Sequence, residues 1–275
     1  MHPQTRVHNL TRMFTLFLAI VVPNLARLIG NSPITATLLA YSLVNAAILT
    51  GFLAWLIPRV HLRRWSLALL VWLELLVVGY LNNYVEGLYY TTLSDKPGVL
   101  VYSVVGALVS SALWATFGAI LFGQGTSSIT TSLEVHFSRR SRSSWIWRIL
   151  IASAAYFPIY FFFGALISPF VLPYYSSVAF GLRIPPFTVI VPLELFRGFV
   201  YTLVLLPLLA ATVGSRTTKL VALAATLYVP GGLIALLGNQ LMPPQIIPFH
   251  ALEILADSIA YALVLSRLLS RPERP

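Results

Sequence analysis

The chain has 275 residues, of which 58% are hydrophobic and only 9% are charged, and its mean hydropathy is +0.83. A water-soluble domain contains about 25% charged residues, so this composition excludes a soluble globular protein and indicates an integral membrane protein. The sequence contains no cysteine, which excludes disulfides, iron–sulfur clusters and thiolate metal sites. The net charge is +10. We interpret the basic residues as signals that orient the transmembrane helices, so we expect the lipid bilayer, and no nucleic acid, as a partner.

Apolar stretches long enough to cross a bilayer, which takes about 20 residues, follow one another along the chain. We predict eight transmembrane helices, at residues 13–30, 34–57, 65–90, 99–123, 145–170, 186–213, 220–241 and 246–268. Pro23, Asn24 and Arg27 interrupt the first of them, which leaves a signal peptide as the alternative interpretation of that segment. The expected fold class is all-α: one polytopic transmembrane helix bundle that includes residues 1–275 as a single domain.

The distribution of basic residues predicts the orientation of this bundle. With the N-terminus inside, the inner segments contain fourteen of the 18 lysines and arginines. Basic residues near short loops stay on the cytoplasmic side. The pattern therefore predicts that both termini are cytoplasmic, in a plasma membrane of the prokaryotic type. It also favours a retained first span, because removing that span would invert all the others.

Two predicted loops are longer than the rest. The inner one, at 124–144, is rich in Ser, Thr and Arg, and we expect a flexible loop at the anionic inner surface. The outer one, at 171–185, contains aromatic residues, Pro and Gly. We expect it to lie on the membrane or to cap a cavity.

Ionisable residues within the spans are the main functional signal. Each costs about 2.5–3.5 kcal/mol on insertion scales, so such residues usually face a cavity or one another. The set comprises Arg27, Glu74, Glu86, Glu194, Arg197, His250, Glu253 and Asp257, accompanied by Asn24, Asn82, Asn83 and Asn239. Counted from the predicted helix ends at about 1.5 Å per residue, nearly all of them lie in the outer half of the bilayer. Glu74 is the deepest exception.

Residues three or four positions apart share a helix face, and several of these polar residues are so spaced. His250, Glu253 and Asp257 form one stripe, and Glu194 shares a face with Arg197. We therefore predict one outward-facing polar cavity lined by the third, sixth and eighth predicted helices, with the first and seventh as further candidates. The predicted ion or substrate site contains Glu86, Glu194, Arg197, Asn239, His250, Glu253 and Asp257.

Each of these groups has more than one interpretation. Glu194 and Arg197 form either a structural ion pair or a carboxylate held ionised, ready to bind a cation or act as a base. His250, Glu253 and Glu194 are candidate ligands of a divalent metal ion, although a histidine near the interface also serves as a hydrogen-bonding residue. Asp257 is a candidate proton carrier or a partner of Arg197.

Two short segments resemble a known family. The segment ELFRGF (194–199) resembles the E-E-x-x-(F/Y)-R-G signature of the CAAX-protease and bacteriocin-processing membrane enzymes, and FHALE (249–253) resembles their late histidine motif. The resemblance implies a multi-helix intramembrane enzyme with Glu194 as a catalytic carboxylate, Arg197 as its partner and His250 as a catalytic histidine. Pro192 and Leu193 replace the family's paired glutamates, and no histidine between 137 and 249 supplies its middle motif.

Three functions follow as hypotheses. The first is a secondary transporter that uses buried carboxylates for cation or proton coupling, and the VPGG segment (229–232), which interrupts a predicted span, favours it. The second is an intramembrane hydrolase, as the family resemblance implies. The third is a membrane scaffold in which the polar groups only fix helix packing. The substrate, whether small solute, ion, peptide or lipid, is not defined by the sequence.

Overall fold

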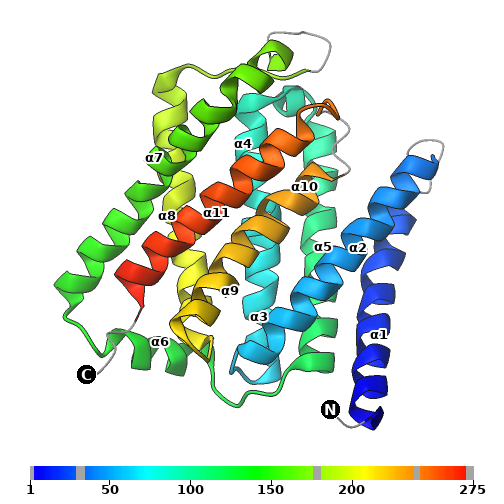
Figure 1. Ribbon diagram of the computed structural model, residues 1–275, viewed down its shortest axis with the longest axis vertical. Coiled ribbons are helices and arrows are strands. Elements are labelled where there is room, and N and C mark those ends of the chain that lie inside the picture. The colour runs from blue at the N-terminus through cyan, green and yellow to red at the C-terminus, as the bar shows by residue number, and fades with distance from the viewer. Residues whose placement is uncertain (1–2, 29–34, 176–180, 238–241, 271–275) are drawn as a thin grey trace.

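The computed structural model describes residues 3–28, 35–175, 181–237 and 242–270. In these ranges the chain is all-α, as predicted, and its β pairing is limited to isolated bridges between loop residues. Eight long helical stretches follow one another (Figure 1). They are α1 (Pro3–Leu28); α2 (Ala36–Leu56) with η1 (Ile57–Arg59); α3 (Arg64–Leu73) with η2 (Glu74–Leu81) and α4 (Asn82–Tyr90); α5 (Pro97–Phe122); α7 (Arg142–Tyr175); α8 (Phe187–Ala211); α9 (Arg216–Tyr228) with η5 (Val229–Leu233) and α10 (Ile234–Leu236); and α11 (Ile247–Leu269).

Within the described ranges, six of these stretches are long and apolar enough to cross a membrane, which is compatible with a multi-pass membrane protein. They are Ala36–Arg59, Arg64–Tyr90, Pro97–Phe122, Arg142–Tyr175, Phe187–Ala211 and Arg216–Leu236. They correspond to the second to seventh predicted spans. The first predicted span coincides with α1, which is apolar only over Asn9–Leu25, and the eighth coincides with α11. That these two helices also cross the membrane stays a prediction.

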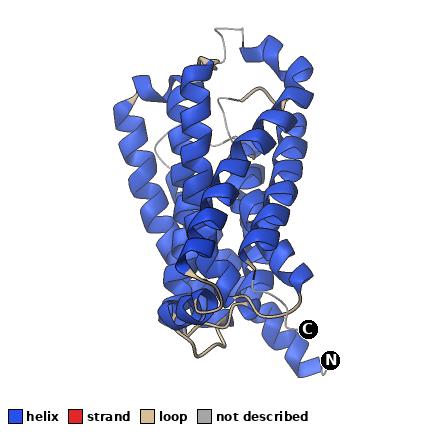
Figure 2. Cartoon of the chain, turned by 90° about the vertical axis from the view of Figure 1, so that its left-hand side faces the viewer, coloured by secondary structure: helices blue, strands red, loops and turns tan. Residues whose placement is uncertain are grey.

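Both ends of the helical bundle can be followed in the figures. The start of α1 and the end of α11 lie at the same end (Figures 1 and 2). Backbone hydrogen bonds join the connecting segments there, from His61 N–H to the Ala211 carbonyl (3.0 Å) and from Arg63 N–H to the Ser127 carbonyl (2.8 Å). Arg59, Arg64, Arg142 and Arg216 start or finish helices at this end, which we call the basic end.

The surface of the bundle is apolar and its interior contains charge. Large hydrophobic side chains are exposed along α5 and α7, among them Val101, Val105, Phe162 and Phe170. Several ionisable side chains are instead buried: Glu74, Glu194, Arg197, Glu253 and Asp257. This distribution is the reverse of that in a soluble domain and is typical of a helix bundle surrounded by lipid.

Local sequence signals explain where several helices begin. Thr35, Ser128 and Ser215 cap α2, α6 (Ile129–Phe137) and α9, because each side-chain hydroxyl accepts a hydrogen bond from the backbone N–H three residues later. Pro97 is the first residue of α5, a position where its missing N–H removes no helical hydrogen bond. Polar caps therefore mark the boundaries of these apolar helices.

Two helices contain π-helical segments, and these segments meet. The segment η2 follows α3, and η5 has the sequence VPGGL. A Cβ placed on Gly79 of η2 would lie 3.2 Å from the Pro230 carbonyl oxygen of η5, so the two backbones approach closely. The Asn83 side-chain amide donates hydrogen bonds to the carbonyls of Gly79 (3.1 Å) and Gly231 (2.8 Å). The predicted interruption at 229–232 is thus confirmed, and a second one lies beside it.

The two longer predicted loops both differ from their predicted bounds, and the outer one begins later than predicted, because α7 extends to Tyr175. Residues 129–137 form α6 rather than a flexible loop, because Ser128 caps the helix and Trp145 packs edge-on against Phe137 with ring centroids 4.9 Å apart. In the outer loop, Thr92 N–H donates to the Gly181 carbonyl (2.9 Å) and Arg183 N–H donates to the Tyr90 carbonyl (2.7 Å). This part of the outer segment is therefore attached to the end of α4, at the opposite end from the basic end.

Close packing of α7 on α8 yields a first prediction. A Cβ on Gly198 of α8 would clash with the Ser153 carbonyl oxygen and lie 2.6 Å from Tyr156 Cβ. We expect Gly198→Ala to reduce the stability of the purified protein in detergent by about 1–3 kcal/mol, because neither helix backbone can move away cheaply. Gly51→Ala is the matched control, since nothing lies within 4 Å of its added Cβ. Equal melting temperatures for the two variants would contradict this packing.

Candidate functional site

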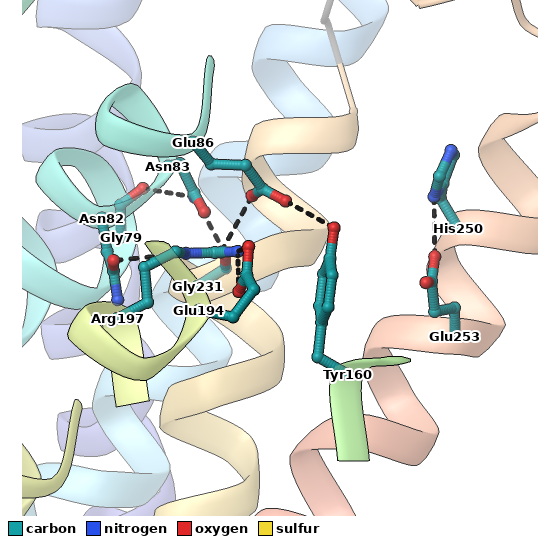
Figure 3. Close-up of polar contacts among 10 residues, drawn as sticks. All are labelled: Gly79, Asn82, Asn83, Glu86, Tyr160, Glu194, Arg197, Gly231, His250 and Glu253. Carbon is teal, nitrogen blue, oxygen red and sulfur yellow. Dashed lines mark hydrogen bonds and ion pairs between the residues drawn. The ribbon is translucent and has the colours of Figure 1, made fainter. Parts of the chain in front are cut away.

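Arg197 of α8 is the most highly connected charged residue of the described chain. Its Nη1 atom donates to both carboxylate oxygens of Glu194, at 3.0 and 2.8 Å. Its Nη2 atom lies 2.8 Å from Glu86 Oε2, and its Nε donates to Asn82 Oδ1 at 3.3 Å. The Arg197 guanidinium therefore pairs with Glu194 on its own helix and joins α8 to α4 through the Glu86 carboxylate and the Asn82 amide (Figure 3).

Three tyrosine rings complete the surroundings of this guanidinium. The Arg197 Cζ atom lies 5.7 Å from the ring centroids of Tyr156 and Tyr160 and 5.9 Å from that of Tyr201. A cation over aromatic faces at such distances is stabilised, more so when water is excluded. The Tyr160 hydroxyl also donates to Glu86 Oε1 at 3.3 Å. Arg197 is thus held by α4, α7 and α8 together.

The second polar group belongs to α11. His250 Nδ1 lies 2.8 Å from Glu253 Oε2, as the spacing of three residues predicted. Glu253 also approaches α7 closely, because a Cβ on Gly164 would be 3.1 Å from its Oε1 atom. Asp257 is one turn further along and only 7% exposed, and its Oδ1 atom has no hydrogen-bonding partner among the described residues.

A cavity of about 210 Å³ lies between the two groups. Figure 3 shows the Arg197 group on one side and His250 with Glu253 on the other, with Tyr160 between them in this view. Its wall is formed by α4, α7, α8, η5, α10 and α11. Charged or ionisable lining residues are Glu86, Arg197, His250, Glu253 and Asp257, and six tyrosines line it as well: Tyr90, Tyr156, Tyr160, Tyr175, Tyr201 and Tyr261.

Hydrogen bonds between α8 and α11 support one wall of this cavity. The fully buried Tyr261 donates its hydroxyl to the Gly198 carbonyl at 2.9 Å and lies 2.7 Å from the Thr202 hydroxyl. Thr202 in turn donates to the same carbonyl at 2.8 Å. All polar atoms of this contact are therefore satisfied within the bundle, as hydrocarbon surroundings require.

The structure places most of the predicted site residues around this cavity. Glu86, Arg197, His250, Glu253 and Asp257 line it. Glu194 is fully buried behind Arg197 and is held there by both of its carboxylate oxygens. Asn239 lies outside the described residues.

Some expectations about the surroundings of the cavity need correction. The ion pairs of Arg197 are with Glu194 and Glu86, and not with Asp257. The described part of α1 packs against α2 and α5 and contributes nothing to the cavity wall, and the side chain of Arg27 is outside the described part. Glu74 is buried apart from the cavity, and neither of its carboxylate oxygens has a hydrogen-bonding partner among the described residues.

One side of the cavity was not predicted at all. Tyr156, Tyr160 and Tyr175 come from α7, a helix without charged residues in its apolar part. The absence of charge therefore left this helix without a predicted site residue. Tyr156 and Tyr160 on either side of the mid-helix Pro158, and Tyr175 at the end of the same apolar helix, were the signal available.

The proposed metal ligands are not brought together. Glu194 is bound to Arg197, whereas His250 and Glu253 contact one another in the second group. Within the described ranges, no three or more His, Asp and Glu side chains are arranged to hold a metal ion. Metal binding by His250, Glu253 and Glu194 stays a prediction that the geometry does not favour.

Comparison with known proteins gave no relative: no protein-family model, no curated protein and no solved structure matches this chain. The function of this chain is therefore inferred from the geometry of the site.

The burial of Arg197 leads to a second prediction. Removing one partner of a buried ion pair leaves the remaining charge uncompensated and costs about 3–5 kcal/mol. Arg197→Met leaves both Glu194 and Glu86 without their cation, so we expect a loss of stability of this size, measured by unfolding in detergent. Arg183→Met is the matched control, because its ion pair with Asp95 is about half exposed and should contribute less than about 1 kcal/mol. Similar losses in the two variants would contradict the central position of Arg197.

Proposed function

We propose that this chain is a secondary transporter that binds its solute in the cavity between α4, α7, α8 and α11 and uses buried carboxylates for cation or proton coupling. The observation that carries the proposal is a charged cavity inside an apolar helix bundle. Charged groups at membrane depth are costly and mark ion and substrate pathways in membrane proteins. A scaffold needs no cavity lined by Glu86, Glu253 and Asp257.

The broken helices support transport in particular. In many carriers, interrupted helices form the binding site, because their backbone groups are free to contact solute and ions. Here Gly231 and Gly232 of the π-helical η5 line the cavity, together with Asn83, which bonds the backbones of both η2 and η5. A movement of η2 relative to η5 would therefore change the shape of the cavity wall.

The proposal includes a topology of eight spans, with α1 and α11 crossing the membrane as well. Both helices extend along the bundle (Figure 1), and an even number of crossings agrees with the start of α1 and the end of α11 lying at the basic end. Basic residues favour the cytoplasmic side. We therefore propose a plasma membrane orientation in which the termini are inside and the cavity is nearer the outer face.

An intramembrane hydrolase is the second candidate, because Arg197 and His250, which both belong to the family resemblance, line the same cavity. Glu194 argues against it, since a water-activating carboxylate must reach the substrate and Glu194 is fully buried against Arg197. Under this candidate, Glu86 would be the carboxylate that faces the cavity.

Reconstitution into proteoliposomes tests the proposal. Proton and sodium fluxes are measured with interior dyes while a panel of small amines, amino acids, sugars and carboxylates is added outside. We expect at least one solute to drive a flux several-fold above that of empty liposomes, and Asp257→Asn to abolish it. Glu134→Gln is the control, because this exposed carboxylate of α6 lies outside the cavity.

A mass-spectrometric search for cleaved peptide or lipid products in the same samples separates the two candidates. Solute-driven flux without products supports the transporter. Products that disappear in Glu86→Gln or His250→Ala, with no flux for any solute, would overturn it in favour of the hydrolase. If neither flux nor products are detected, and Asp257→Asn is as stable as wild type, the membrane scaffold is the remaining hypothesis.

A further inference from the structure

We propose that the solute of this cavity is a small organic amine, bound as its ammonium ion with the N–H groups donated to Asp257. This inference rests on the proposed transport function and adds the class of substrate. It is argued from the charge balance, the aromatic lining and the size of the cavity.

Asp257 is the carboxylate of the cavity wall that has no ion-pair partner among the described residues, and the single charge of Arg197 is already shared by Glu86 and Glu194. Glu86 faces the Arg197 guanidinium and Glu253 faces the His250 ring. Asp257 is nine-tenths buried, lines the cavity, and has a buried Oδ1 atom without a hydrogen-bonding partner among the described residues. A buried acceptor of this kind costs free energy until a donor reaches it. An ammonium ion in the cavity would place the opposite charge beside Asp257 and would donate an N–H to its carboxylate group.

The arrangement favours an organic cation over a metal ion. A metal ion needs several oxygen or nitrogen ligands at short range, and the described residues do not bring three such side chains together. Tyrosine rings are abundant instead. Tyr90, Tyr175 and Tyr261 line the cavity in addition to the three rings that surround Arg197. Aromatic faces attract ammonium groups and also cover the apolar part of an organic molecule.

Size agrees with this assignment. The cavity of about 210 Å³ corresponds to several water molecules at about 30 Å³ each, which is too much space for one bare ion. It is small beside the 300–1,000 Å³ typical of drug-sized ligands. We therefore expect an amine of about ten non-hydrogen atoms or fewer.

Binding to the purified full-length protein is the test, with butylamine, benzylamine and phenethylamine as probes. Each is compared with the neutral alcohol of the same shape: butanol, benzyl alcohol and phenethyl alcohol. Affinity is measured by calorimetry and by the rise in melting temperature, with tetramethylammonium and sodium as cations that cannot donate an N–H. We expect at least one amine to bind wild type at least tenfold more tightly than its alcohol, and tetramethylammonium to bind more weakly than that amine.

The variants locate the site. Asp257→Asn should lower the affinity of that amine at least tenfold, and Glu134→Gln should leave it unchanged. If Asp257→Asn does not fold, the ratio of amine affinity to alcohol affinity in wild type still tests whether the cavity binds an ammonium ion. The inference is overturned if no amine binds more tightly than its alcohol, or if binding survives in a folded Asp257→Asn. Should neutral or anionic solutes drive flux in the proteoliposomes while amines do not, this inference fails and the transport function stands.

Discussion

The arrangement of this bundle depends on one buried cation. The Arg197 guanidinium is compensated by Glu194 on its own helix and by Glu86 on α4, and it lies among tyrosine rings from α7 and α8. In hydrocarbon surroundings, such a charge is tolerated only where partners are fixed around it. The three helices that supply these partners are therefore constrained to one relative position, and the cavity beside them has a defined shape.

For function, it matters that the acidic residues differ in their partners. Glu194 and Glu86 hold Arg197, and Glu253 contacts His250, so these carboxylates are committed to protein partners. Asp257 lines the cavity and has a buried Oδ1 atom without a hydrogen-bonding partner among the described residues. The π-helical segment η5 lines the same cavity, and Asn83 bonds its backbone to that of η2. A fixed charged centre beside two irregular helices is an arrangement in which solute binding and helix movement can be coupled.

Much of the fold could be predicted from the sequence, because bilayer length and apolar composition determine where helices lie. The pairs Glu194–Arg197 and His250–Glu253 followed from helical spacing alone. Contacts between helices did not follow, since spacing within one helix says nothing about its neighbours. Thus Glu86, rather than Asp257, pairs with Arg197, and the tyrosines of α7 were missed because they carry no charge. The capped helix α6 could not be predicted, because a polar, basic composition is equally typical of a flexible loop.

We propose that the acidic cavity lies in the membrane and is open toward the side opposite the basic end, and thiol labelling measures this directly. The chain has no cysteine, so in a variant with one introduced cysteine all labelling of the protein comes from that position. His250→Cys places a thiol in the cavity wall, and Trp65→Cys places one on the exposed surface at the basic end. In intact cells, we predict that membrane-impermeant cationic thiosulfonates modify position 250 at least tenfold faster than anionic ones, and that position 65 reacts only after permeabilisation. Modification of position 65 alone from outside, or equal rates for both reagents at position 250, would contradict the account.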